Sequence, residues 1–140
     1  MAAQKLQSLP GRKTIILITD GQDIGSIATI AKAVQAAQEA DAVVYGIQYE
    51  DDERGYPGRN GMSALEKLSE PTGGRTFRVT RKMPLEVIFD DIGEEMRNQY
   101  GLGFRRAADG REGEFHKLEV KSTMAGVKVQ ARTGYYSGRK

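Results

Sequence analysis

TIILITDG, residues 14–21, is the stretch from which the fold of this chain can be predicted. A run of apolar and β-branched residues that ends in Asp-Gly is typical of a fully buried parallel strand in an α/β sheet. Ligands of open α/β folds bind outside the carboxyl ends of the strands. Asp20, at the end of this run, is therefore the first candidate functional residue.

The composition limits the class of protein. The chain has 140 residues and a formal net charge of +2, so we expect a core of useful size and no nucleic-acid binding. No apolar run reaches the ~18 residues that a membrane helix needs, which predicts no membrane insertion. The absence of cysteine excludes disulfides, thiolate catalysis and zinc–thiolate sites, and it leaves the compartment open.

Strand and helix patterns alternate as far as residue 98. Such alternation implies parallel pairing with right-handed crossovers, and therefore a three-layer α/β/α-type fold around a three-stranded parallel core. A helix ends within residues 4–9. The expected strands are 14–20, 42–48 and 75–80, and the expected helices are 26–40 with a cap at Ser26, 62–69 and 83–98.

The pattern changes after residue 98. Tyr100, Leu102 and Phe104 alternate with other residues, as do the apolar residues of 115–122 and 127–133, with a turn at 124–126 between the last two. This predicts a C-terminal antiparallel β hairpin or meander. We therefore expect an α/β domain over residues 1–98 and a β extension, residues 99–140, packed on it.

Parallel strands place all their carboxyl ends at one rim of the sheet. The expected rim also includes part of the long loop at residues 49–61, where four carboxylates follow one another. Carboxylate oxygens suit hard cations, although the spacing fits no EF-hand loop. The candidate rim residues are Thr19, Asp20, Gly21, Asp23, Glu50 and Asp51.

The sequence gives little support to catalysis. Residues 11–14 (GRKT) resemble part of a phosphate-binding loop, but a strand follows where a helix must begin. His116 is the one histidine, and the chain has no cysteine. A Ser-His-Asp or Cys-His triad would therefore have a single possible base, and the sequence shows no supporting motif for one. We expect a structural role for His116 and no enzyme. A receiver-like or nucleotide-binding α/β domain is the enzymatic alternative, and it would need a Gly-rich loop or acidic residues beside Asp20.

Taken in order, several stretches resemble the C-terminal half of a von Willebrand factor A-type domain, in the subgroup common in acidobacterial proteins. The likeness covers nearly the whole chain and rests on the order and spacing of its parts. Residues 9–13 with 16–21 resemble the fourth strand, and residues 40–47 resemble the fifth. Residues 65–69 and 72–77 resemble the helix and the sixth strand that follow. The C-terminal part of the pattern is matched by residues 97–104, 117–120 and 131–136.

The resemblance implies a metal-ion-dependent adhesion site that is incomplete in this chain. The family uses an Asp-x-Ser-x-Ser motif, a Thr from a later loop and an Asp after the fourth strand. Only the last maps here, onto Asp20, and the sequence contains no Asp-x-Ser-x-Ser. Because Mg²⁺ needs near-octahedral oxygen ligation, we expect no cofactor in this chain, and Mg²⁺ only together with an N-terminal half.

The implied function is a non-enzymatic protein-binding or cell-adhesion module with a protein ligand. The chain would be a fragment or a truncated gene product of an exported bacterial protein, periplasmic or extracellular. In the family the fourth strand lies beside the first, so strand 14–20 would form an open sheet edge. This predicts a homodimer, through that edge or through a swapped β extension. A structural self-assembling subunit is the alternative function.

Overall fold

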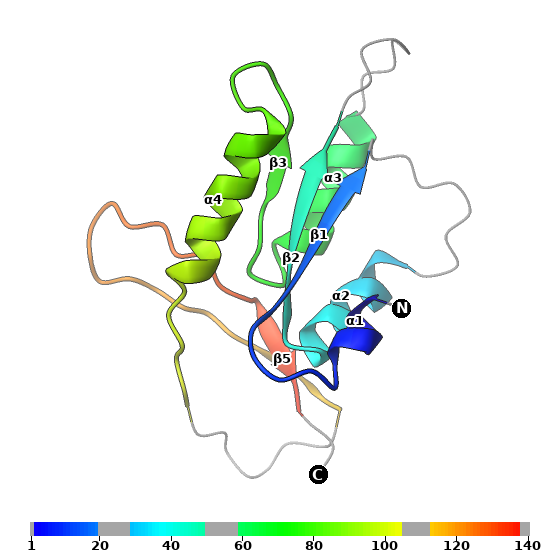
Figure 1. The fold of residues 1–140 in the computed structure, drawn as a ribbon. Coiled ribbons are helices and arrows are strands. Elements are labelled where there is room, and N and C mark those ends of the chain that lie inside the picture. The colour runs from blue at the N-terminus through cyan, green and yellow to red at the C-terminus, as the bar shows by residue number, and fades with distance from the viewer. Residues whose placement is uncertain (1, 20–28, 50–58, 105–112, 138–140) are drawn as a thin grey trace.

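The computed structural model describes residues 2–19, 29–49, 59–104 and 113–137 (Figure 1). Helices and strands alternate through the first hundred residues, and two short strands follow. The elements are α1 (Ala2–Leu6), β1 (Lys13–Thr19), α2 (Ile30–Glu39), β2 (Ala42–Gln48), α3 (Arg59–Ser69), β3 (Thr76–Arg78), α4 (Leu85–Arg97), β4 (Phe115–Lys117) and β5 (Gly134–Tyr136).

The main sheet has the order β1-β2-β3, and both strand pairs are parallel. This confirms the predicted three-stranded parallel core. The middle strand β2 is buried along almost its whole length, as expected for a strand covered on both faces. The expectation that β1 is fully buried is wrong, because Ile16 and Ile18 are 37% and 54% exposed. The physical reason is that β1 lies at the sheet edge.

Helix α4 covers one face of the sheet (Figure 1). Its buried Ile88 and Ile92 pack on Tyr45 and Ile47 of β2 and on Phe77 of β3. Each of these side chains is at most 3% exposed, so this cluster is the main apolar core. Burial of one such side chain stabilises the fold by roughly 1.5–3 kcal/mol.

The other three helices lie on the opposite face. Ala3 of α1 and Ala40, just after α2, pack around Ala42 at the start of β2. Leu65 of α3 lies against Gly46, where an added Cβ would come within 3.1 Å of the Leu65 Cβ. Helices therefore cover both faces of the parallel sheet, in an α/β/α arrangement.

Several predicted boundaries need correction. The hydroxyl of Thr29 accepts a hydrogen bond from the Lys32 amide, so Thr29 rather than Ser26 is the N-cap of α2. Ile30 follows this cap and is exposed. Helix α3 begins at Arg59, inside the segment expected to be loop, and β3 is shorter than residues 75–80.

The C-terminal part contains a two-stranded antiparallel sheet, so the antiparallel pairing predicted there is confirmed, while the strand bounds differ. Phe115 pairs with Tyr136 and Lys117 with Gly134, so β5 begins after the strand predicted at 127–133. The pairing register nevertheless centres between Ala125 and Gly126, within the predicted turn. The arms at 118–122 and 127–131 form no strand, and their valines are exposed because no described element covers them.

The C-terminal segment packs on the turn between α3 and β3. The Thr133 amide donates to the Pro71 carbonyl at 3.1 Å, and Gln130 Nε2 donates to the Gly73 carbonyl at 2.9 Å. Thr72 and Arg132 form an antiparallel bridge, and Arg132 also pairs with Asp41 beside β2. A domain boundary at residue 98 stays a prediction.

Candidate functional site

The carboxyl ends of the three parallel strands meet at one rim. Thr19 pairs with Gln48, and Gln48 pairs with Arg78. The Tyr49 amide donates to the Thr19 carbonyl at 3.0 Å, so the carboxyl ends of β1 and β2 lie side by side. The structure thus places Thr19 at the expected rim. The other five candidates, which are Asp20, Gly21, Asp23, Glu50 and Asp51, lie outside the described residues.

The described part of the chain does not supply a metal centre. Within it, no three His, Cys, Asp or Glu side chains gather in a way that could hold a metal ion.

The free edge of β1 is the most unusual feature of the described surface. Among the described strands, β2 is its one neighbour, so the outer side of β1 carries no ladder (Figure 1). Ile16 pairs with Tyr45 and Ile18 with Ile47, which places both isoleucines on the face that α4 covers farther along the sheet. Over β1 itself that face is open, as their exposure shows.

One flank of α4 extends this apolar area. Asp91 and Glu95 face Arg75, beside β3. Phe89 and Met96 lie on the other side of the buried Ile88–Ile92 stripe, and both are exposed.

Because Asp91 and Glu95 face Arg75 on the β3 side, and β1 lies on the other side of β2, the flank with Phe89 and Met96 is turned toward β1. We call Ile16, Ile18, Phe89 and Met96 together the β1 surface.

Within the part of the chain that the structure describes, the edge shows none of the usual protection against pairing. Natural edge strands are blunted by charged side chains, proline, bulges or a covering segment. Residues 14–19 contain no charge and no proline. Lys13 is turned to its own chain, where its Nζ donates to the Ala40 carbonyl at 2.9 Å. Helix α1 packs under the opposite face of the sheet and does not cover the β1 surface.

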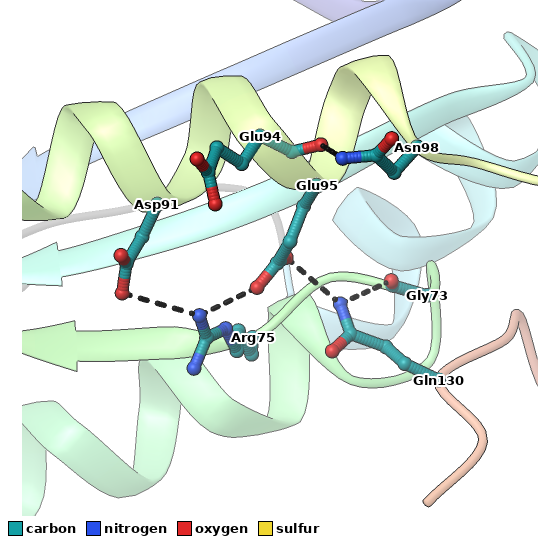
Figure 2. A network of polar contacts seen from close by, with 7 residues as sticks. All are labelled: Gly73, Arg75, Asp91, Glu94, Glu95, Asn98 and Gln130. Carbon is teal, nitrogen blue, oxygen red and sulfur yellow. Dashed lines mark hydrogen bonds and ion pairs between the residues drawn. The ribbon is translucent and has the colours of Figure 1, made fainter.

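A polar network fixes α4 over β3, on the side away from β1 (Figure 2). Arg75 Nη2 lies 2.5 Å from Glu95 Oε1 and 3.6 Å from Asp91 Oδ2. The guanidinium also stacks over Phe77, with 4.3 Å from Cζ to the ring centroid. Gln130 Nε2 donates to Glu95 Oε2 at 3.4 Å and also to the Gly73 carbonyl, so the network includes the C-terminal segment.

Tyr45 lies beneath this network. The pKa of its hydroxyl is raised to about 12, first by burial and then by the nearby Glu95 carboxylate, which acts through its charge and through a hydrogen bond. The Gln99 side chain acts in the opposite direction. The raised pKa reflects a neutral hydroxyl held inside the core, which is a structural role.

This pKa predicts a loss of stability in alkali. The folded-state pKa lies above the model value of 10.0, so the unfolded chain loses the proton first. The free energy of unfolding should therefore fall as the pH rises from about 10 to about 12.

Urea unfolding at a series of pH values measures this slope, and Tyr45→Phe should flatten it. Tyr100→Phe, at an exposed position, should keep the wild-type slope. Equal slopes for Tyr45→Phe and wild type would contradict the prediction.

His116 lies in β4 and stacks on Tyr135 of β5, with 5.1 Å between ring centroids. Its Nε2 is buried and has no hydrogen-bond partner among the described residues. The position agrees with the expected packing role on a strand face.

Comparisons with known proteins give one structural likeness to report. No protein-family model matches the chain, and no curated protein matches it. A crystal structure described as an uncharacterized membrane spanning protein from Vibrio fischeri is similar, with a TM-score of 0.51 and 25% identity. The alignment covers 66% of this chain and 51% of that one, so the chain spans about half the length of that structure.

The likeness is one of fold, and membrane spanning is a description of the other protein. In this chain, no helix among the described residues is long and apolar enough to cross a bilayer.

Proposed function

We propose that this chain is a non-enzymatic protein-binding module that takes a strand of its partner at the free edge of β1. The observation that carries the proposal is the edge itself, which is apolar, free of charge from residue 14 to residue 19, and flanked by exposed Ile16 and Ile18. Strand addition at an exposed edge is a common mode of peptide recognition. Main-chain hydrogen bonds supply affinity there, and alternate side chains supply specificity.

The β1 surface adds an apolar contact beside the edge. A strand paired with β1 would lay its side chains next to Ile16 and Ile18 on one face, near Phe89 and Met96 of α4. Burial at about 25 cal/mol per Å² of apolar surface would favour this contact. The sequence resemblance supports the same reading, because a von Willebrand factor A-like domain continues its sheet beyond this strand.

Metal binding is not part of the proposed function of the chain by itself. Asp20 is the one residue that maps onto the family's metal ligands, and the sequence lacks the Asp-x-Ser-x-Ser motif. A single carboxylate leaves most of the octahedral positions of Mg²⁺ without a protein ligand.

We therefore expect Mg²⁺ and Mn²⁺ to bind this chain weakly or not at all. Titration calorimetry should detect no site with a Kd below about 1 mM, and Asp20→Ala should behave as wild type. A tight stoichiometric site that Asp20→Ala abolishes would contradict this expectation and the view that the adhesion site is incomplete.

A strand peptide tests the proposed function. The probe is a fluorescent peptide that carries residues 14–19 between flanking lysines, and its anisotropy reports binding to the full chain. A second peptide carries proline at the position of Ile16. The proline removes a backbone donor and blocks hydrogen bonding between the peptide and the edge strand.

We expect saturable binding that weakens at least about tenfold with the proline peptide, equivalent to 1.4 kcal/mol. It should weaken similarly with the protein variant Ile16→Lys. Equal binding of the two peptides would show that contact does not depend on strand pairing, and would overturn the proposal.

A further inference from the structure

The geometry points to a second copy of this chain as the partner at the β1 edge, paired antiparallel about a two-fold axis through Ile16. This inference rests on the proposed function, because it names the partner of the same edge. Its result is a continuous six-stranded sheet in which the two β1 strands lie at the centre. The structure supplies three independent features that favour this partner.

The first feature is that β1 is complementary to itself. In an antiparallel pair centred on Ile16, Thr14 faces Ile18 of the other copy, and Ile15 faces Leu17. Each pair therefore joins β-branched or apolar side chains, which stabilise a sheet by roughly 0.2–1 kcal/mol per pair relative to Ala–Ala. A symmetric pairing also closes on itself, so it makes a dimer and not a fibre.

The second feature is that the pairing joins matching faces of the two sheets. A two-fold axis normal to the sheet keeps each face on its own side, so the exposed Ile16 and Ile18 of both copies form one apolar stripe. The α4 helices of both copies then border this stripe with Phe89 and Met96. On the opposite face, α1 and α2 lie against Ile15 and Ala42 at the start of their strands.

The third feature is the charge distribution. No charged side chain lies between residues 14 and 19, so no like charges meet at the centre of the pair. Lys13 is engaged with the Ala40 carbonyl of its own chain. The Arg75, Asp91 and Glu95 network lies on the β3 side of α4, away from the edge.

The β extension is a less suitable dimer contact. Its described part is fastened to its own chain by bonds to Pro71 and Gly73, and by the Arg132–Asp41 pair. A swap would have to break these contacts and form them again in the other copy. Pairing through β1 leaves every one of them in place.

Light scattering over a concentration series tests for the dimer. One strand pair buries less than the usual 1,200–2,000 Å² of a stable interface, so we expect a weak dimer whose population rises with concentration. Ile16→Lys should make the chain monomeric, because two lysines would then face each other at the two-fold axis. Val87→Lys, an equally exposed apolar position on the far flank of α4, should leave the dimer unchanged.

A cysteine pair tests the register. The chain has no cysteine, so a single engineered one can pair only with that of another copy. Facing residues of an antiparallel pair have Cα atoms about 4.5–5.5 Å apart, which is within the range for a disulfide. Ile16→Cys should therefore crosslink under mild oxidation. Ile18→Cys should not, because the two copies of residue 18 would stand about 13 Å apart along the strands.

The outcomes separate this inference from the proposed function. A chain that is monomeric at about 1 mM but binds the strand peptide overturns the self-pairing and leaves the proposed function standing. A chain that neither dimerises nor binds the peptide overturns both. A dimer that survives Ile16→Lys, or that crosslinks at Ile18→Cys but not at Ile16→Cys, uses another contact or register and overturns the inference.

Discussion

Gly74→Ala should destabilise the fold more than any other single methyl that could be added to a described glycine. A Cβ at this position would overlap the Val44 carbonyl oxygen and would lie 2.7 Å from the Val44 carbonyl carbon. Both groups belong to backbone, so no rotamer change relieves the contact. Because Gly74 leads directly into β3, the strand would have to move away from β2. We expect a loss above about 4 kcal/mol, which is exceptional for one substitution.

The comparison with other glycines makes this prediction specific. Gly101→Ala adds the same methyl where no atom of the described residues lies within 4 Å, so it should change the urea midpoint little. Gly73 has φ +88, and a substitution there would mix backbone strain with crowding. Far-ultraviolet circular dichroism shows first whether Gly74→Ala folds. A Gly74→Ala chain that folds with the stability of Gly101→Ala would contradict the close approach of β3 to β2.

The sequence predicts β2 well because its environment is uniform. Residues 42–48 are apolar or small almost throughout, and helices cover both faces, so the strand found has the same bounds as the strand predicted. β1 has a similar composition, yet Ile16 and Ile18 are exposed. A run of apolar residues indicates that a strand is suited to burial. It does not indicate which helix or strand packs on its faces.

The width of the apolar stripe on α4 was a signal of the candidate site. In the sequence, the helical spacing of the apolar residues places Leu85, Ile88, Phe89, Ile92 and Met96 on one face of the helix. The structure divides them, with Ile88 and Ile92 against the sheet and Phe89 and Met96 on the exposed flank toward β1. The apolar stripe is wider than the part of the helix that packs on β2 and β3. A stripe of this width in a sequence indicates that the helix makes a further apolar contact.

Long-range contacts were beyond prediction from the sequence. The Arg75 network and the bonds from Gln130 and Thr133 join residues far apart in the chain, and no local pattern marks them. The strands expected at 115–122 and 127–133 show the same limitation. Their alternation is real, but a strand also needs a partner and a covered face, and this part of the chain offers few of either.

Ile88→Ala should be the second most damaging change, because Ile88 is fully buried where α4 meets the sheet. Truncation of a core isoleucine to alanine costs about 2–5 kcal/mol, as lost transfer free energy and as the cavity left behind. Helix propensity cannot explain such a loss, since alanine is the best helix former.

Val87→Ala is the matched control, because it shortens the adjacent side chain of the same helix at a position that is 41% exposed. Urea unfolding should place it within about 1 kcal/mol of wild type. If the two variants had equal midpoints, α4 would not bury the face that holds Ile88. The flank that carries Phe89 and Met96 would then no longer be fixed toward β1, so this pair of variants also tests the basis of the β1 surface.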